Sequence, residues 1–189
     1  MNITIKNASI KSTIFLKYGY DHFVNSTKYS HPSTTGDAPI HDDLRDAFAA
    51  LTPHFAFICE EISESMCKQS ITDFENGVFY KDEEVDPLRK YDVIGFALGK
   101  DSEGVTIIGT KKLDSGKSIN INTPFLKWDD DYAFSSELIA AVDLLKSEVY
   151  EYIEGKRAPA QNQTMDMFET DIDDEEEGSG KKHFADVEM

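Results

Sequence analysis

Basic and aromatic residues interleave near the N-terminus of the chain, a combination that can bind single-stranded nucleic acid. The set comprises Lys11, Phe15, Lys17, Tyr18, Tyr20, Lys28 and Tyr29. Aromatic rings stack on bases and cations contact phosphates in such sites. Residues 1–36 also carry four lysines against one aspartate. The segment therefore predicts a surface for single-stranded DNA. The alternative, that half of these rings fill the core face of a strand, stays open.

Two other segments contain residue types found in binding sites but lack the spacing or context that such sites need. In "GFALGKD" three residues separate Gly95 from Gly99, and Asp101 follows Lys100, whereas a Walker phosphate loop needs four residues and a Ser or Thr. A strand that ends in a hairpin turn explains this segment better. The acidic run at residues 129–131 could bind a hard cation, but it precedes an expected helix, and carboxylates there match the positive N-terminal end of the helix.

The histidines and cysteines do not indicate a metal centre or a catalytic site. His31, His41 and His54 lack the spacing of ligands, and the only two cysteines, Cys59 and Cys67, fall in or just after an apolar stretch typical of buried thiols. No serine elbow, Cys-His pair or paired-carboxylate signature is present. We therefore expect no metal, no cofactor and no enzymatic activity.

The net charge of -17 is the unusual total. Residues 37–90 hold thirteen acidic and five basic side chains, and residues 164–189 hold ten acidic side chains and two lysines. Such charge repels nucleic acid unless the basic groups are segregated. It leaves a second hypothesis open: an acidic inhibitor or regulator that binds proteins, could imitate DNA and never binds nucleic acid.

The N-terminus lacks the apolar core of a signal peptide, and no apolar run reaches membrane-spanning length. We therefore expect a cytoplasmic protein without a membrane partner. A homo-oligomer is left open.

Strands are expected to carry the interleaved residues. Alternation over residues 10–20 predicts one long strand, with a short strand at 3–5 before it and a turn at 7–8. Residues 24–31 are expected to return as a third strand, followed by a loop at 31–39. A meander is predicted at 92–99, 104–112 and 117–125, and a further strand could lie at 77–81.

Two apolar stripes predict long helices. The first begins near residue 42 and comprises Leu44, Phe48, Leu51, Phe55, Ile58 and Ile62. Pro53 interrupts it, so we expect a kink; the alternative is two helices, with Thr52 capping the second. The second helix is expected at residues 135–155, capped by Ser135 or Ser136 and ended by Gly155.

The predicted fold class is α+β, an antiparallel sheet with two long helices in two β-β-β-α units. This order resembles that of the Whirly and PC4-like folds, which bind single-stranded DNA. We expect one domain at residues 1–157 and a disordered acidic tail at 158–189, because the tail has no core periodicity.

The tail carries apolar anchors beside its acidic run. The pentapeptide 164–168 contains Met165, Asp166, Met167 and Phe168. It is similar to the peptide that bacterial replication proteins insert into the sliding clamp, although Thr164 stands where that peptide has glutamine. The acidic stretch also resembles the tails of bacterial and phage single-stranded-DNA-binding proteins, without their terminal phenylalanine. A tail that only aids solubility is the alternative.

These features favour a non-enzymatic accessory protein of DNA replication or recombination, similar to proteins of phages or mobile elements. Its body would bind single-stranded DNA, and its tail would recruit a sliding clamp or another replication or repair protein.

Overall fold

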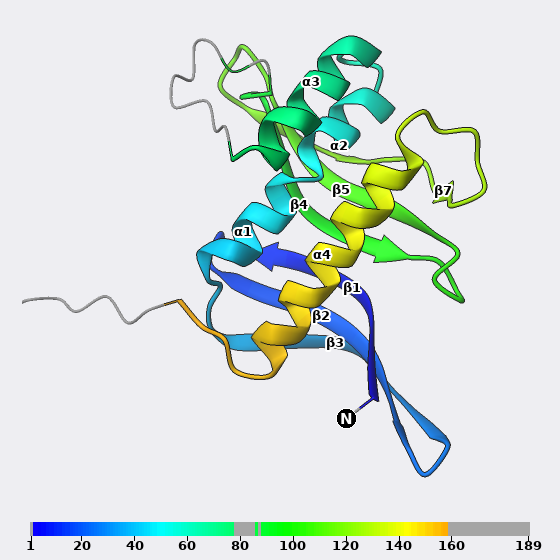
Figure 1. Cartoon of the computed structure of the whole chain (residues 1–189). Coiled ribbons are helices and arrows are strands. Elements are labelled where there is room, and N and C mark those ends of the chain that lie inside the picture. The colour runs from blue at the N-terminus through cyan, green and yellow to red at the C-terminus, as the bar shows by residue number, and fades with distance from the viewer. Residues whose placement is uncertain (1, 78–85, 87, 159–189) are drawn as a thin grey trace, which may run out of the picture. The chain divides into compact units, whose positions relative to one another are not determined.

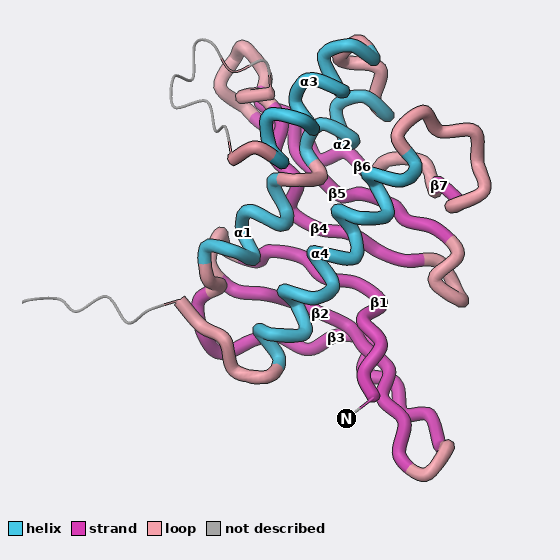
Figure 2. Tube along the Cα trace, viewed as in Figure 1, coloured by secondary structure: helices cyan, strands magenta, loops and turns pink. Residues whose placement is uncertain are grey.

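Two antiparallel meanders join side by side in one seven-stranded sheet. A computed structural model describes residues 2–77, 86 and 88–158. The first meander is β1 (Asn2–Lys11), β2 (Phe15–Val24) and β3 (Thr27–Pro39); the second is β4 (Tyr91–Leu98), β5 (Gly104–Lys112) and β6 (Ser118–Asn122). The strand order is β3-β2-β1-β4-β5-β6, and β7 (Leu126–Lys127) pairs with β5. Antiparallel pairing of β1 with β4 makes the two meanders continuous (Figure 2).

The hairpin between β1 and β2 corrects the prediction of one strand at residues 10–20. The chain turns at Ser12 and Thr13, whose φ angles are 53° and 64°. Residues 7–8, predicted as a turn, continue β1, and the register shifts between Ile5 and Asn7. Residues 31–39, predicted as a loop, belong to β3 because they pair with β2. The meander at 92–125 is confirmed.

The first predicted helix is divided rather than kinked. α1 (Asp42–Ala49) and α2 (Thr52–Ile58) are separate, and Pro53 lies in the first turn of α2, where its missing N–H needs no partner. Thr52 is inside α2, and Leu51 occupies the cap position without a side-chain hydrogen bond.

A third helix, α3 (Glu64–Glu75), was not predicted; the Ser63 side chain caps its start. The last helix, α4 (Ser135–Ile153), agrees with the prediction, although Phe134 and not a serine stands at its cap. Gly155 follows it with a φ of 113°, a conformation that favours glycine.

The helices gather on one face of the sheet (Figure 1). One apolar core joins sheet residues such as Leu16, Phe96 and Ile107 to Phe48 of α1 and Leu145 of α4. The hydroxyl of Tyr152 in α4 donates a 2.5 Å hydrogen bond to the backbone oxygen of Ala38 in β3. The fold is therefore α+β, with strands followed by helices twice in sequence.

Residues Met1–Pro159 form one compact unit. The predicted strand at 77–81 falls almost wholly outside the described residues, and so do the predicted tail and its anchors Met165, Asp166, Met167 and Phe168. Among the described helices, none combines the length and the apolar character needed to cross a membrane.

Candidate nucleic-acid interface

The sheet has a second face that no described helix covers (Figure 1). Residues paired across strands share a face, and neighbours along a strand alternate. Ala8, Leu16 and Phe96 point to the core. The alternate positions line the other side and include Ser9, Lys11, Phe15, Lys17, Thr35, Thr106, Ile108, Thr110, Asn120 and Asn122, together with the carboxylates Asp21 and Asp92. We call this surface the open face. Its residues are mainly small, polar or basic.

Two lysines of the predicted set supply charge to the open face. Lys11 and Lys17 are both exposed, and neither forms an ion pair with any residue that the structure describes. Lys17 lies opposite Ser9 of β1 and Thr35 of β3, and Lys11 lies opposite Phe15. Their ammonium groups are therefore available to phosphate.

Lys28 shares this face, but its charge already has a partner. Its Nζ lies 2.8 Å from the carboxylate of Asp21, and Ser30 Oγ donates a 2.6 Å hydrogen bond to the same group. Asp21 is only 6% exposed, and the hydrogen bonds from Lys28 and Ser30 lower its pKa. The ammonium group of Lys28 is therefore less available to phosphate than those of Lys11 and Lys17.

The tyrosines of the predicted set lie on the opposite face. Tyr18 packs edge-on against Tyr152, with ring centroids 6.2 Å apart, and Tyr20 stacks on His31 at 4.6 Å. Tyr29 stacks on His22 at 5.1 Å, and the two histidines approach to 3.0 Å between His31 Nε2 and His22 Nδ1. The structure therefore divides the seven predicted residues: Lys11, Phe15, Lys17 and Lys28 share the open face, and Tyr18, Tyr20 and Tyr29 do not.

The β2–β3 hairpin projects beyond the rest of the sheet (Figure 1). Near its tip Phe23 is 43% exposed and lies opposite Lys28, which places it on the open face. Phe23 belongs to the same interleaved stretch of the sequence, although it is not among the seven predicted site residues. It is in phase with Phe15 and Lys17 along the alternating strand.

Charge is divided between the strands and the helices. The strand-bearing segments 2–39 and 91–127 carry nine basic and six acidic side chains. The helix-bearing segments 42–75 and 135–153 carry twelve acidic and three basic ones. The negative charge of the described body therefore belongs to its helices. This segregation is what binding of nucleic acid by an acidic protein requires.

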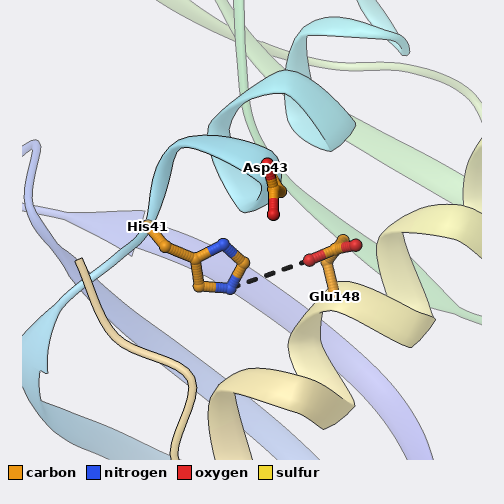
Figure 3. Close-up of side chains that lie close together, drawn as sticks. All are labelled: His41, Asp43 and Glu148. Carbon is orange, nitrogen blue, oxygen red and sulfur yellow. Dashed lines mark ion pairs between the residues drawn. The ribbon is translucent and has the colours of Figure 1, made fainter. Parts of the chain in front are cut away.

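Three potential metal ligands meet where α1 begins, beside α4 (Figure 3). One ligand atom each from His41, Asp43 and Glu148 lies within 4.8 Å of the others. His41 Nε2 is buried without a hydrogen-bond partner, 3.7 Å from Glu148.

Two features make this cluster a structural link rather than a metal site. His41 Nδ1 accepts a 3.2 Å hydrogen bond from the Leu44 N–H, so the proton of the neutral ring must sit on Nε2, the atom that would have to bind the metal. Lys156 Nζ lies 2.7 Å from Asp43 and 2.8 Å from Glu148, where it already neutralises the carboxylates. Burial and the Lys156 charge lower the pKa of His41, which keeps the capping ring neutral.

Buried His54 of α2 pairs with the partly buried Tyr132, which precedes α4. His54 Nδ1 is 2.9 Å from the Tyr132 hydroxyl oxygen, and burial lowers the pKa of His54 to about 4. Burial also raises the pKa of the Cys67 thiol to about 12. A general base or a thiolate needs a pKa nearer to neutrality. Neither group therefore matches a catalytic role at neutral pH.

The comparisons with known proteins were negative. No known protein family matches the sequence, and neither a curated protein nor a solved structure is similar to it. The function is therefore inferred from the surfaces of the molecule.

Proposed function

We propose that the protein binds single-stranded DNA across the open face of its sheet, as a non-enzymatic accessory protein of replication or recombination. The observation that carries the proposal is the joint presence of two cations and two rings on a face that no described helix covers. The cations are Lys11 and Lys17, which form no ion pair with a described residue, and the rings are those of Phe15 and Phe23. Cations for phosphates and rings for bases are the two components of such sites.

The dimensions of β2 suit an extended strand of nucleic acid. Phe15 and Phe23 are eight residues apart on the same side of one strand, which corresponds to about 26 Å at the rise of a β-strand. Bases could stack at both ends of this span while the backbone passes Lys17 between them. On this face Gly19 leaves room for the nucleic-acid backbone, and the carboxylate of Asp21 is paired with Lys28.

The acidic helices oppose this binding only weakly at physiological salt. They lie on the far side of the sheet, and a helix layer packs about 10 Å from a sheet. The Debye length is about 8 Å at 0.15 M salt. Repulsion from the helices is therefore largely screened at the open face, whereas Lys11 and Lys17 would contact phosphate directly.

A titration of fluorescent oligo-dT with the full chain tests the proposal. Lys11→Gln combined with Lys17→Gln should weaken binding about tenfold and reduce the salt slope by about 1.4, since each phosphate contact to a single strand contributes about 0.7. Phe23→Ala should weaken binding at least fivefold, because stacking contributes about 1–3 kcal/mol per base. The matched control is Lys68→Gln with Lys146→Gln, which removes the same charge from α3 and α4.

The comparison of the two double variants distinguishes binding at the open face from a general effect of net charge. Equal weakening by the two double variants would show that net charge alone matters. Absence of binding by the unsubstituted protein would contradict the proposal outright.

The tail is assigned a recruiting role on sequence alone. Met165, Met167 and Phe168 would enter a pocket of a partner such as the sliding clamp, with Asp166 between them. A peptide of residues 161–177 should bind the clamp, and Phe168→Ala should abolish the binding.

The charge of the helices favours a second candidate, an acidic regulator that binds proteins. Twelve acidic against three basic side chains on the helix-bearing segments would attract a basic partner. This function does not require the open face, so the oligo-dT titration distinguishes the two candidates.

A further inference from the structure

α4 carries a buried apolar stripe and, beside it, a second and more exposed row of mainly apolar residues. Leu138, Val142, Leu145 and Val149 are buried against the sheet and α1. A second stripe follows the helical repeat at Glu137, Ala140, Ala141 and Leu144. Leu144 is 47% exposed, whereas its neighbour Leu145 is completely buried. Ala141 packs partly against the core, whereas Ala140 and Leu144 are exposed, so the second stripe presents an apolar surface that the described body covers only in part.

This second stripe forms one wall of a groove. Ile71 and Phe74 of α3 form the other wall, and Ala50 and His54 lie between them. The cavity has a volume of about 320 Å³, and Glu75 and Glu137 are the acidic members of its lining. We call it the α3–α4 groove. Its lining is mainly apolar and carries a carboxylate from each of the two helices.

We infer that the α3–α4 groove is a docking site for a basic amphipathic helix of a protein partner. An amphipathic helix places apolar anchors at i, i+3, i+4 and i+7 into such a groove. The alanines at positions 50, 140 and 141 have short side chains, so the backbone of the partner can approach closely. The inference does not rest on binding of nucleic acid.

The negative charge of the groove favours a basic helix over an acidic one. Glu75 and Glu137 line the groove, and the helices around it are strongly acidic. Lysine or arginine residues beside the apolar anchors would find carboxylates there, and the field of the acidic helices would accelerate encounter. An acidic helix with the same anchors would be repelled by the same groups, so the groove distinguishes partners by charge as well as by shape.

A synthetic peptide can serve as the probe for this site. The probe is an 18-residue helix with leucine at i, i+3, i+4 and i+7 and lysine on the remaining face. Two control peptides carry the same residues in scrambled order or glutamate in place of lysine. Amide and methyl chemical shifts of the full chain report the site, and peptide fluorescence reports the affinity. Peptide-induced shifts should concentrate at Ile71, Ala141 and Leu144.

Variants of the full chain then separate the groove from nonspecific attraction. Leu144→Glu should weaken binding at least tenfold and leave the fold intact, because this side chain is half exposed. Glu75→Lys with Glu137→Lys should weaken it similarly. Ile119→Glu introduces the same charge at another exposed apolar side chain, on β6, and should change the affinity less than twofold.

Four results would overturn the inference. They are no binding of the probe, equal binding of the scrambled or acidic peptide, shifts that map elsewhere, and full affinity in Leu144→Glu.

Discussion

The open face of the sheet and the helix layer differ in both charge and use of apolar residues. On the open face, lysines and isolated rings stand among small polar side chains, and the strand-bearing segments have a basic excess. On the helix layer, acidic side chains surround an apolar groove. The first combination suits a polyanion with exposed bases, and the second suits a basic protein segment.

The difference shows that the net charge of this chain does not describe the charge of each face. A protein of charge -17 would be expected to repel DNA. The sheet separates the two signs, however, and salt screens each face from the other over a distance of about one layer. Each face can therefore be tested by substitutions that leave the opposite face unchanged.

The largest expected effect distinguishes the two leucines that are adjacent on α4. Leu145→Ala should lower the free energy of unfolding by about 2–5 kcal/mol, because it leaves a cavity in the core. Leu144→Ala should lower it by less than about 0.5 kcal/mol, since its side chain is half exposed. Urea unfolding of both variants measures the difference. A large loss in Leu144→Ala would mean that the second stripe serves the core and not a partner.

The next effect concerns the buried imidazole of His54 in α2. The pKa of His54 is about 4 in the folded protein, below the value of about 6.5 in an unfolded chain. Between pH 6.5 and 4 the unfolded chain binds a proton there that the folded protein does not, so stability falls as the pH falls. From pH 6.5 to 4.5 this one group should remove about 2–3 kcal/mol.

His54→Gln supplies the control for this prediction, because it keeps a polar side chain that does not titrate. Unfolding curves at pH 6.5, 5.5 and 4.5 should show a steeper loss in the unsubstituted protein than in the variant. The lowered pKa of His41 acts in the same direction but is common to both proteins, so it cancels. Parallel losses in the two proteins would place the pH sensitivity in groups other than His54, such as His41.

The sequence predicted α4 well and the first hairpin poorly, for physical reasons. α4 has one continuous core stripe, and the spacing of such a stripe depends on local geometry alone. The β1–β2 turn has no Gly, Pro or Asn to mark it. Ile10 before the turn and Leu16 after it are separated by an even number of positions, so a single alternating strand would place both on the same side. Alternation therefore continued through the turn, and two strands were taken for one. α3 was missed, and with it one wall of the groove.

The open face was partly predictable. Parity along β2 already separates Phe15 and Lys17 from Tyr18 and Tyr20, since neighbours in a strand point to opposite sides. Which side the helices would cover depends on contacts between residues far apart in the sequence. The tyrosines were therefore placed in one site with the lysines, although the structure puts them on opposite faces.

The smallest expected effect concerns one carboxylate of the open face, that of Asp21. Asp21 is nearly buried and holds Lys28, whereas Asp37, also in the first meander, has a side chain 93% exposed and only a 3.7 Å contact with Arg157. Asp21→Asn and Asp37→Asn change the net charge equally. Asp21→Asn should lower the free energy of unfolding at pH 7 by about 1–2 kcal/mol, because charge-assisted hydrogen bonds from Lys28 and Ser30 are lost. The cost should vanish as the pH falls through the lowered pKa of Asp21, since the unsubstituted carboxyl is then protonated as well.

The same substitution releases the Lys28 ammonium on the open face. Affinity for oligo-dT should therefore rise about two- to threefold in Asp21→Asn, which corresponds to one additional phosphate contact partly screened by salt. Asp37→Asn should leave both stability and affinity nearly unchanged, because its carboxylate is solvated and lies beside Arg157. Tighter binding in both variants alike would show that the DNA responds to net charge and not to the face on which the lysines lie.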